Sequence, residues 1–179
     1  MIIISEYTES DKGDGVIIEC NQDCICPLCQ STVCHRDWKP RIMKLDGGQV
    51  RWLVIERRQC INQGCHKLHS LLPDKLVPYK HYASELITGV LDGDIGPEDP
   101  MNEEYPCDET LHRWNHWFMA NLFRIEGYCG LVWHHVPDPG MGFMQPGASI
   151  LETIQRSCDR WLAAILRMIY NSGGFLVSS

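Results

Sequence analysis

The chain has 179 residues, a formal net charge of −7 at pH 7 and an apolar fraction of 44%. This length suits one ordinary domain or two small ones, and this composition excludes wholesale disorder. The chain has no run of about 18 apolar residues, and its first residues lack the basic start of a secretory signal. We therefore expect a cytoplasmic protein without a membrane span.

The first 19 residues are predicted to form an N-terminal arm or a small hairpin. Residues 2–4 and 16–18 are short runs of isoleucine and valine, which favour strands. Residues 12–15 carry two glycines and are predicted to form the turn between them.

Residues 20–78 have the pattern of a small β structure. Residues 50–58 are rich in β-branched and aromatic side chains, and the stretch Asp46-Gly47-Gly48 before them is a strong turn signal. We expect residues 32–44 to pair with this strand as an antiparallel hairpin.

Seven of the ten cysteines also lie in this segment. In a reducing compartment, clustered cysteines are more often metal ligands than disulfides. Cys26 and Cys29 form a CxxC turn, and Cys60 and Cys65 form a looser CxxxxC pair, in which Gly64 is expected to ease the turn. The hairpin would bring both pairs to one end, as in a zinc ribbon. We predict one structural Zn²⁺ ion with four thiolate ligands and no open position for chemistry.

Other ligand sets and other cysteine chemistry remain possible in this cluster. His66 or His69 could replace Cys65 as the fourth ligand, and Cys24 is a further candidate ligand. A redox pair is disfavoured, because Pro27 lies inside the CxxC turn and no βαβ pattern follows. The remaining nearby thiols and imidazoles, and the three scattered cysteines, are expected to be bystanders; these residues are Cys20, Cys34, His35, Cys107, Cys129 and Cys158.

Charge is distributed unevenly around this segment. Residues 33–80 hold ten Lys/Arg and four acids, a local balance of +6. Residues 92–110 hold eight acids and no Lys/Arg, and residues 1–32 hold six acids and one Lys. A basic block between acidic flanks is typical of an interaction surface. The alternative is a pair of solvated faces that segregate without a partner.

The basic side chains of the predicted hairpin are interleaved with Trp38 and Trp52. Cations and aromatic rings on one strand surface suit phosphate contact and base stacking, whereas the alternative places both tryptophans in a core. We favour nucleic acid, and the residues expected to contact it here are Arg36, Lys39, Arg41, Arg51, Arg57, Arg58 and Lys80.

Residues 79–179 are predicted to be mainly helical, with a helix-turn-helix-like segment over about residues 79–123. Apolar residues recur at helical spacing over residues 80–91, and Gly93 would end that helix. An acidic loop with Pro and Gly follows over residues 92–106. A second helix is expected over residues 108–123, capped by Asp108.

The second helix of this segment would carry the contacts to bases and phosphates. Trp114 and Trp117 fall on its apolar stripe and are expected in the core. Thr110, Arg113 and His116 lie off that stripe, where they could reach DNA.

The last part of the chain is predicted to be a loop followed by one long helix. Residues 124–146 contain a Pro/Gly-rich stretch, and His134 and His135 are interpreted as surface or loop residues. A C-terminal helix is expected over about residues 149–170, ended by Gly173 and Gly174.

The sequence resembles an uncharacterised bacterial family whose members carry a transposase-type zinc ribbon followed by a helix-turn-helix. The resemblance extends over about residues 24–175. The residues that carry it are 26–29, 57–65, 69, 72–74, 76–82, 110–114, 117–118 and 161–172. It implies that Cys26, Cys29, Cys60 and Cys65 bind zinc and that the following helices bind DNA. The ribbon is similar to the N-terminal domains of insertion-sequence transposases. Two departures are the acidic insertion at 92–104 and a recognition helix with Arg113 as its one arginine.

An active transposase also needs a domain with three metal-binding carboxylates, and too little chain remains for one. We therefore predict an α+β protein, with a small β zinc ribbon before a mostly helical region, that binds duplex DNA and is not an enzyme. The alternative is a protein–protein adaptor built on the same ribbon. No motif for a small-molecule substrate is present.

Overall fold

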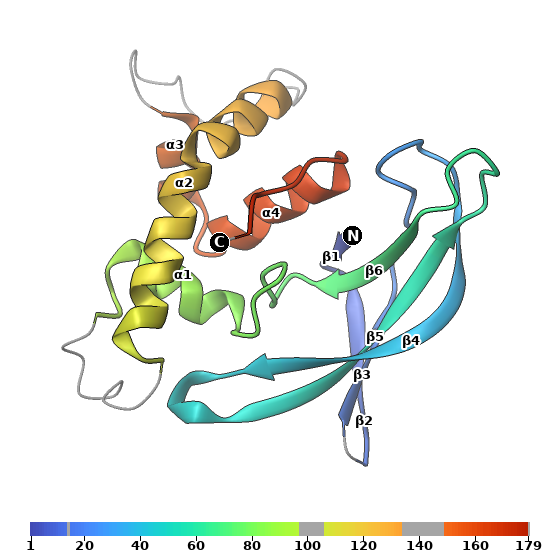
Figure 1. Cartoon of the computed structure of the whole chain (residues 1–179), viewed down its shortest axis with the longest axis horizontal. Coiled ribbons are helices and arrows are strands. Elements are labelled where there is room, and N and C mark those ends of the chain that lie inside the picture. Colours follow the sequence, from blue (N-terminus) through green and yellow to red (C-terminus); the bar gives the residue numbers. More distant parts are fainter. Residues whose placement is uncertain (14, 97–105, 134–148, 179) are drawn as a thin grey trace.

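The structure is a computed structural model of the chain and describes residues 1–13, 15–96, 106–133 and 149–178. In these ranges six strands precede four helices, so the predicted α+β class is confirmed. Figure 1 shows the strands as one curled sheet and the helices gathered beside it. Much of the predicted acidic loop, together with His134 and His135, lies outside the described residues. The strands are β1 (Ile2–Ile4), β2 (Tyr7–Lys12), β3 (Gly15–Cys20), β4 (Val33–Lys44), β5 (Val50–Cys60) and β6 (Leu68–Pro73).

Strand β5 is the centre of the sheet, which curls into a half-barrel. One edge of β5 pairs with β4 in antiparallel register from Val33↔Cys60 to Lys44↔Val50. The other edge pairs first with β3 in parallel and then with β6 in antiparallel direction. The predicted hairpin is confirmed, and its tip is the short helical turn η1 (Asp46–Gly48), in which Gly47 has a φ of 65°. Glycine adopts such a left-handed conformation at little cost, which explains its presence at position 47.

The N-terminal hairpin forms, but with a different first strand. The turn lies between β2 and β3, as expected. These two strands are antiparallel, with Glu9 paired to Ile18 and Asp11 to Val16. Residues 2–4 instead form β1, which runs parallel to β6. Strands β1, β2 and β3 belong to the same sheet as β4–β6.

The first two helices follow the predicted pattern with different ends. Helix α1 (Ser84–Asp92) starts four residues later than expected and ends at Gly93, which has a φ of 83°. Helix α2 (Asp108–Trp133) continues ten residues beyond the expected end at residue 123. Gly127 and Gly130 lie inside this helix, and a Cβ at either position would meet open space. Within the described ranges, no helix has both the length and the apolar character needed to cross a membrane.

Two helices replace the single one expected over residues 149–170. Ser149 caps α3 (Ile150–Ser157) by accepting a hydrogen bond from the Glu152 backbone. Cys158 then has extended backbone angles, and α4 (Trp161–Asn171) begins in a new direction. The break carries no Gly or Pro, and its Arg160 forms an ion pair with Asp74 of the sheet region at 3.1 Å.

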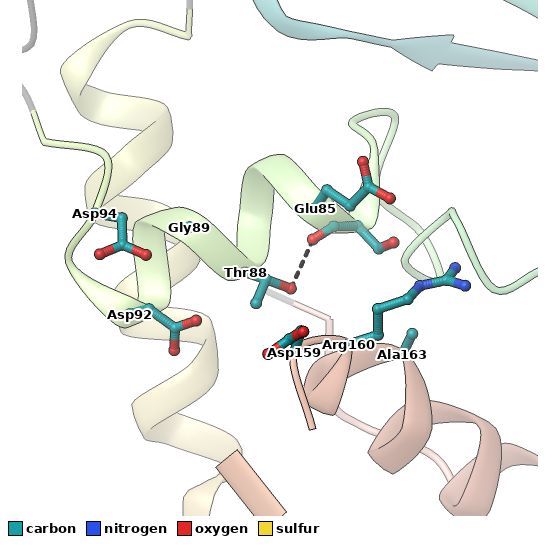
Figure 2. Close-up of a pocket in the computed structure, with 9 residues that line it drawn as sticks. Glu85, Thr88, Gly89, Asp92, Asp94, Asp159, Arg160 and Ala163 are labelled. Atoms are coloured by element: carbon teal, nitrogen blue, oxygen red, sulfur yellow. Dashed lines mark hydrogen bonds between the residues drawn. The ribbon is translucent and has the colours of Figure 1, made fainter. Parts of the chain in front are cut away.

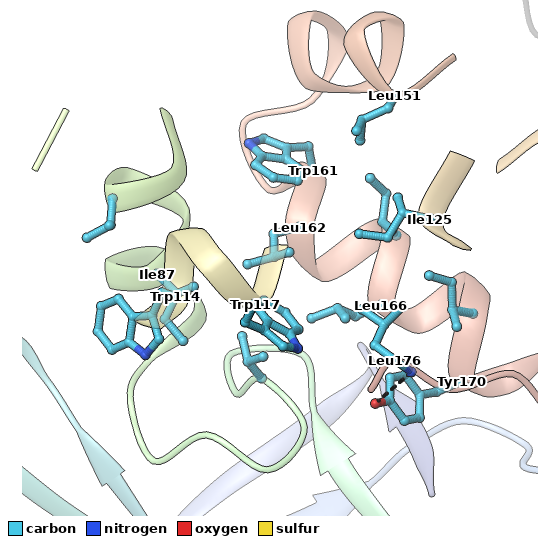
Figure 3. Close-up of a cluster of buried hydrophobic side chains, with 14 of the residues drawn as sticks. Ile87, Trp114, Trp117, Ile125, Leu151, Trp161, Leu162, Leu166, Tyr170 and Leu176 are labelled. Carbon is cyan, nitrogen blue, oxygen red and sulfur yellow. Dashed lines mark hydrogen bonds between the residues drawn. The ribbon is translucent and has the colours of Figure 1, made fainter. Parts of the chain in front are cut away.

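Two apolar clusters form the interior. The helical cluster, shown in Figure 3, is built around Trp114, Trp117 and Trp161 with leucines and isoleucines of α1, α2 and α4. The sheet cluster is built from the strands and includes Cys26 and Cys60. The predicted core positions of Trp114 and Trp117 are confirmed.

Strand β1 lies between these clusters. Ile2 and Ile4 belong to the sheet cluster, whereas Ile3 belongs to the helical cluster. This follows from the alternation of side chains along a strand. The side chain of Asn171 in α4 accepts a hydrogen bond from Ile3 N at 2.8 Å and donates one to Ile3 O at 2.9 Å.

Candidate functional site

Four cysteine sulfurs converge at one end of the β4–β5 hairpin. The Sγ atoms of Cys26, Cys29, Cys60 and Cys65 all lie within 4.8 Å of one another. The Cys26–Cys65 distance is 3.7 Å and the Cys29–Cys60 distance is 3.4 Å. Four sulfurs at about 2.3 Å from a tetrahedral ion would be separated by about 3.8 Å. These four side chains therefore fit a metal ion.

The first cysteine turn is formed by local backbone hydrogen bonds. Cys26 N donates to Ser31 O and Gln30 N donates to Cys26 O, both at 2.8 Å. Gln30, directly after Cys29, has a φ of 59°. That left-handed residue reverses the chain and turns both thiols to the same side.

The second cysteine turn repeats this arrangement. Cys65 N and His66 N both donate to Asn62 O at 2.9 Å. His66 follows its cysteine with a φ of 46°, as Gln30 follows Cys29 in the first turn. Gly64, the residue expected to ease this turn, is not among the residues with positive φ. The two turns meet because Val33 pairs with Cys60 at the base of the hairpin.

The pKa values of two of these thiols, Cys29 and Cys60, are shifted in opposite directions. Hydrogen bonds from the side chain and backbone of Ser31 lower the pKa of Cys29 to about 6. Burial raises the pKa of Cys60 to about 12. A bound cation favours the thiolate forms, so metal binding at this site would release protons.

His69 lies behind the cysteines, not among them. Its Nε2 is 3.3 Å from Cys26 Sγ, and its Nδ1 is 3.2 Å from the Met1 amino nitrogen. Burial lowers the pKa of His69, which favours the neutral imidazole. In the tautomer that carries its proton on Nε2, His69 would donate a hydrogen bond to the Cys26 sulfur while Nδ1 accepts from the Met1 nitrogen. A donor of this kind orients a ligand and stabilises its charge. His66 is exposed.

Cys20 and Cys24 form a separate pair. Their sulfurs are 3.7 Å apart. Burial, followed by the charge of Cys20, raises the pKa of Cys24 to about 12. Among the residues that the structure describes, neither belongs to the converging group, and Cys34 is exposed.

The predicted DNA contacts on the hairpin divide into paired and unpaired cations. Arg57 binds both carboxylate oxygens of Asp37, at 2.5 and 2.6 Å. Arg58 binds both oxygens of Glu56 at 2.9 Å, and His35 contacts the same carboxylate at 3.0 Å. The guanidinium groups of Arg57 and Arg58 are therefore already bound to carboxylates of the sheet. Arg36 is exposed and lies 3.9 Å from Asp37.

Three of the other hairpin cations lie on the face opposite the tryptophans. Lys39 pairs with Ile55, Arg41 with Leu53 and Met43 with Arg51, so Lys39, Arg41 and Arg51 share one face. Trp38 and Trp52 share the other face and are 43% and 51% exposed, so the alternative that placed both tryptophans in a core is wrong, and their role in base stacking stays a prediction.

The helical region places three predicted contacts in one hollow. Lys80, Thr110 and Arg113 line it together. Arg113 is exposed, but Thr110 is only 6% exposed and accepts a hydrogen bond from Arg113 at 3.0 Å, so its expected exposure is wrong. His116 is exposed farther along α2. Tyr79, which has a φ of 63°, also lines this hollow, and no sequence pattern indicated it.

A second hollow, of opposite charge, lies between α1 and the start of α4 (Figure 2). The carboxylates of this hollow are either hydrogen-bonded to other side chains or too far from one another to share a ligand. Asp92 accepts hydrogen bonds from Trp161 Nε1 at 3.0 and 3.1 Å, and Arg160 is paired with Asp74. In the described part of the chain, its carboxylates do not converge as metal ligands do.

The chain matches one known family model over part of its length. Residues 26–114 match a family described as a domain of unknown function (DUF6431). No curated protein and no solved structure matches the chain. The match begins at the first converging cysteine, contains the hairpin and α1, and ends within α2. Over this range, which is narrower than the resemblance implied, the chain is similar to an uncharacterised family.

Proposed function

We propose that the protein binds duplex DNA through the basic face of the β4–β5 hairpin and the adjoining start of α2. The observation that carries this proposal is the arrangement of cations. Lys39, Arg41 and Arg51 share one face of the hairpin, and the Arg41 guanidinium donates to Lys80 O at 2.9 Å. Arg113 lines the same hollow as Lys80. Such a row of cations suits a phosphate backbone.

A duplex is favoured over a single strand by the position of the tryptophans. Single-strand binders stack bases on aromatic rings beside a basic groove. Trp38 and Trp52 lie on the face opposite Lys39, Arg41 and Arg51. One strand could not contact both faces, whereas a duplex needs only the cations. The exposed Arg113 and His116 of α2 supply further contacts, as in a helix-turn-helix.

We propose that the metal is Zn²⁺ and that its role is to hold the fold. Soft thiolates select zinc over magnesium or calcium, and two cysteine turns at one end of a hairpin form a zinc ribbon. Four protein ligands leave no open position for a substrate. The protein would therefore act as a binding module without enzymatic activity, related to the N-terminal modules of insertion-sequence transposases. Metal analysis of the purified chain should give one zinc per molecule.

The DNA proposal is tested by the salt dependence of binding to a mixed-sequence duplex. The double variant Lys39→Gln/Arg51→Gln should weaken binding and reduce the slope of log K against log salt by about two, because two phosphate contacts are lost. Lys12→Gln, on the exposed β2 strand, is the matched control and should leave the slope unchanged. Absence of binding at low salt by the zinc-loaded wild type would refute the proposal.

A protein–protein adaptor is the second candidate, and the exposed tryptophans favour it. Large apolar side chains gathered on one exposed face commonly mark protein contacts. Trp38→Ser/Trp52→Ser should abolish partner binding if that face docks a protein, and should leave salt-dependent DNA binding intact if the first proposal holds.

A further inference from the structure

A small hollow of about 200 Å³ lies where residues 79–82 meet the start of α2. Pockets for drug-sized ligands measure about 300–1,000 Å³, so its occupant must be small. The lining is polar and aromatic and includes Tyr79, Lys80, His81, Thr110, Arg113 and Trp114.

Positive charge is concentrated around this hollow. Arg113 reaches Thr110 through one N–H group, and Lys80 Nζ lies 4.8 Å from the centre of the Trp117 ring. Burial lowers the pKa of Lys80, and the Arg113 charge lowers it further. Burial likewise lowers the pKa of His81, as do the charges of Arg41 and Lys44. Among the described residues, no carboxylate forms an ion pair with Arg113 or Arg41. Cations gathered in this way favour an anionic occupant.

The backbone that presents these groups is held firmly. Lys44 N donates to His81 O at 2.7 Å, and Ala83 N donates to Lys44 O at 2.9 Å. Arg41 Nη2 donates to Lys80 O at 2.9 Å. Tyr79 keeps a φ of 63°, a conformation that costs energy for a side chain of this size and that recurs at ligand sites. The hollow is thus formed in advance of binding.

We infer that this hollow binds a single phosphate group between Arg113 and Lys80. The planar guanidinium of Arg113 offers further N–H donors in the fork geometry that suits phosphate oxygens. Lys80 lines the same hollow and supplies a second positive charge. The phosphate could belong to a DNA backbone, in which case this inference rests on the proposed function, or to free phosphate, which has the same chemistry.

The first experiment titrates inorganic phosphate into the zinc-loaded full chain at constant ionic strength. Trp114 lines the hollow, so tryptophan fluorescence should report saturable binding. Arg113→Gln should raise the dissociation constant roughly tenfold or more, because it removes a charge-assisted contact. Arg124→Gln, on the same helix and exposed, is the matched control and should behave as wild type. Arg113→Lys, which keeps the charge, should recover most of the binding and excludes misfolding as the cause.

The second experiment measures duplex DNA binding by the same variants. A slope of log K against log salt reduced by about one in Arg113→Gln, but not in Arg124→Gln, would assign the phosphate to DNA. Phosphate binding that depends on Arg113 in a protein that binds no DNA would support the hollow and refute the proposed function. If Arg113→Gln leaves DNA binding unchanged and inorganic phosphate does not bind, the phosphate site and the DNA contact of Arg113 are both refuted, while DNA binding through the hairpin face still stands.

Discussion

The sheet and the helices of this protein are stabilised in different ways. The helical cluster is a conventional core, with Trp114, Trp117 and Trp161 buried among leucines and isoleucines. The sheet cluster has its share of isoleucine and leucine, but it ends at the thiols of Cys26 and Cys60. Burial of apolar area can hold the helices, whereas the four cysteines at the end of the sheet fit a metal ion that would join their two turns. Metal removal should therefore destabilise the sheet, and core mutation should destabilise the helices.

Metal removal should have the largest effect and should act on the sheet. Structural zinc supplies about 10–16 kcal/mol of apparent binding free energy in small domains, which is comparable to the whole stability of a domain. After full chelation, amide hydrogen exchange should show lost protection in β4, β5 and β6. Protection should persist in the centre of α2 and in α4.

Matched cysteine variants separate metal loss from thiol loss. Cys26→Ser should reproduce chelation, whereas Cys34→Ser, at an exposed cysteine outside the converging group, should bind metal normally. A β5 strand that stays protected after chelation would show that the sheet does not depend on metal.

Truncation of the helical core should have the next largest effect. Trp161 is 1% exposed and its indole packs edge-on against Phe118, with ring centres 5.5 Å apart. Trp161→Ala should cost about 3–5 kcal/mol of unfolding free energy through the cavity it leaves. Urea denaturation followed by far-UV circular dichroism would measure this loss, and one metal ion per chain should still bind.

Two controls sharpen the Trp161 result. Trp161→Phe keeps most of the volume and removes only the hydrogen bond to Asp92, so it should cost much less than the alanine variant. Loss of metal binding in Trp161→Ala would contradict the separation of the two regions.

Gly173 tests the contact between the regions, with a smaller effect. Its φ is 86°, and a Cβ there would lie 2.8 Å from the carbonyl oxygen of Pro27, inside the first cysteine turn. Gly173→Ala should therefore cost about 1–3 kcal/mol and lower metal affinity as well. Gly127→Ala, in helix α2 with open space around it, should instead raise the melting temperature slightly. Unchanged metal affinity in Gly173→Ala would show that the contact between Gly173 and Pro27 does not influence the metal site.

The smallest expected effect is an acid dependence of the sheet. Burial alone would raise the pKa of Glu56, but hydrogen bonds from Arg58 and His35 outweigh it and hold that pKa below its usual value. The stabilisation is therefore present above about pH 4.5 and is lost as the pH falls through the folded-state pKa. Glu56→Gln should remove this part of the pH dependence of unfolding. Unfolding of metal-loaded protein between pH 3 and 7 would measure it, with the exposed Glu85→Gln as control.

Local signals predicted much of the fold and most of the site. The hairpin is predicted by the turn at Asp46 and by the alternation of side chains after it. The converging thiols are predicted by the cysteine spacings. All three signals are encoded within a few residues of the chain. Helix α1 was placed by the same kind of signal, and Gly93 marked its end. His69 was singled out near the site, although as a possible ligand and not as a neighbour of Cys26.

The remaining features depend on contacts between distant residues. The parallel pairing of β1 with β6 has no local signature, since Ile2 and its partner Leu71 are far apart in the chain. Gly127 and Gly130 resemble helix breakers in sequence, but buried Ile125 and Cys129 continue the apolar stripe of α2. Trp38 and Lys39 face opposite sides by alternation alone, but the placement of Trp52 on the same face as Trp38 required the register of the hairpin.

The hydrogen bonds between Asn171 and Ile3 also have a consequence for the order of folding. They join residues separated by 168 positions, and such distant contacts form slowly because the intervening chain must first be ordered. The isoleucine run is synthesised well before α4, so the side chain of Ile3 stays uncovered until that helix is made. Until then this apolar run is open to aggregation.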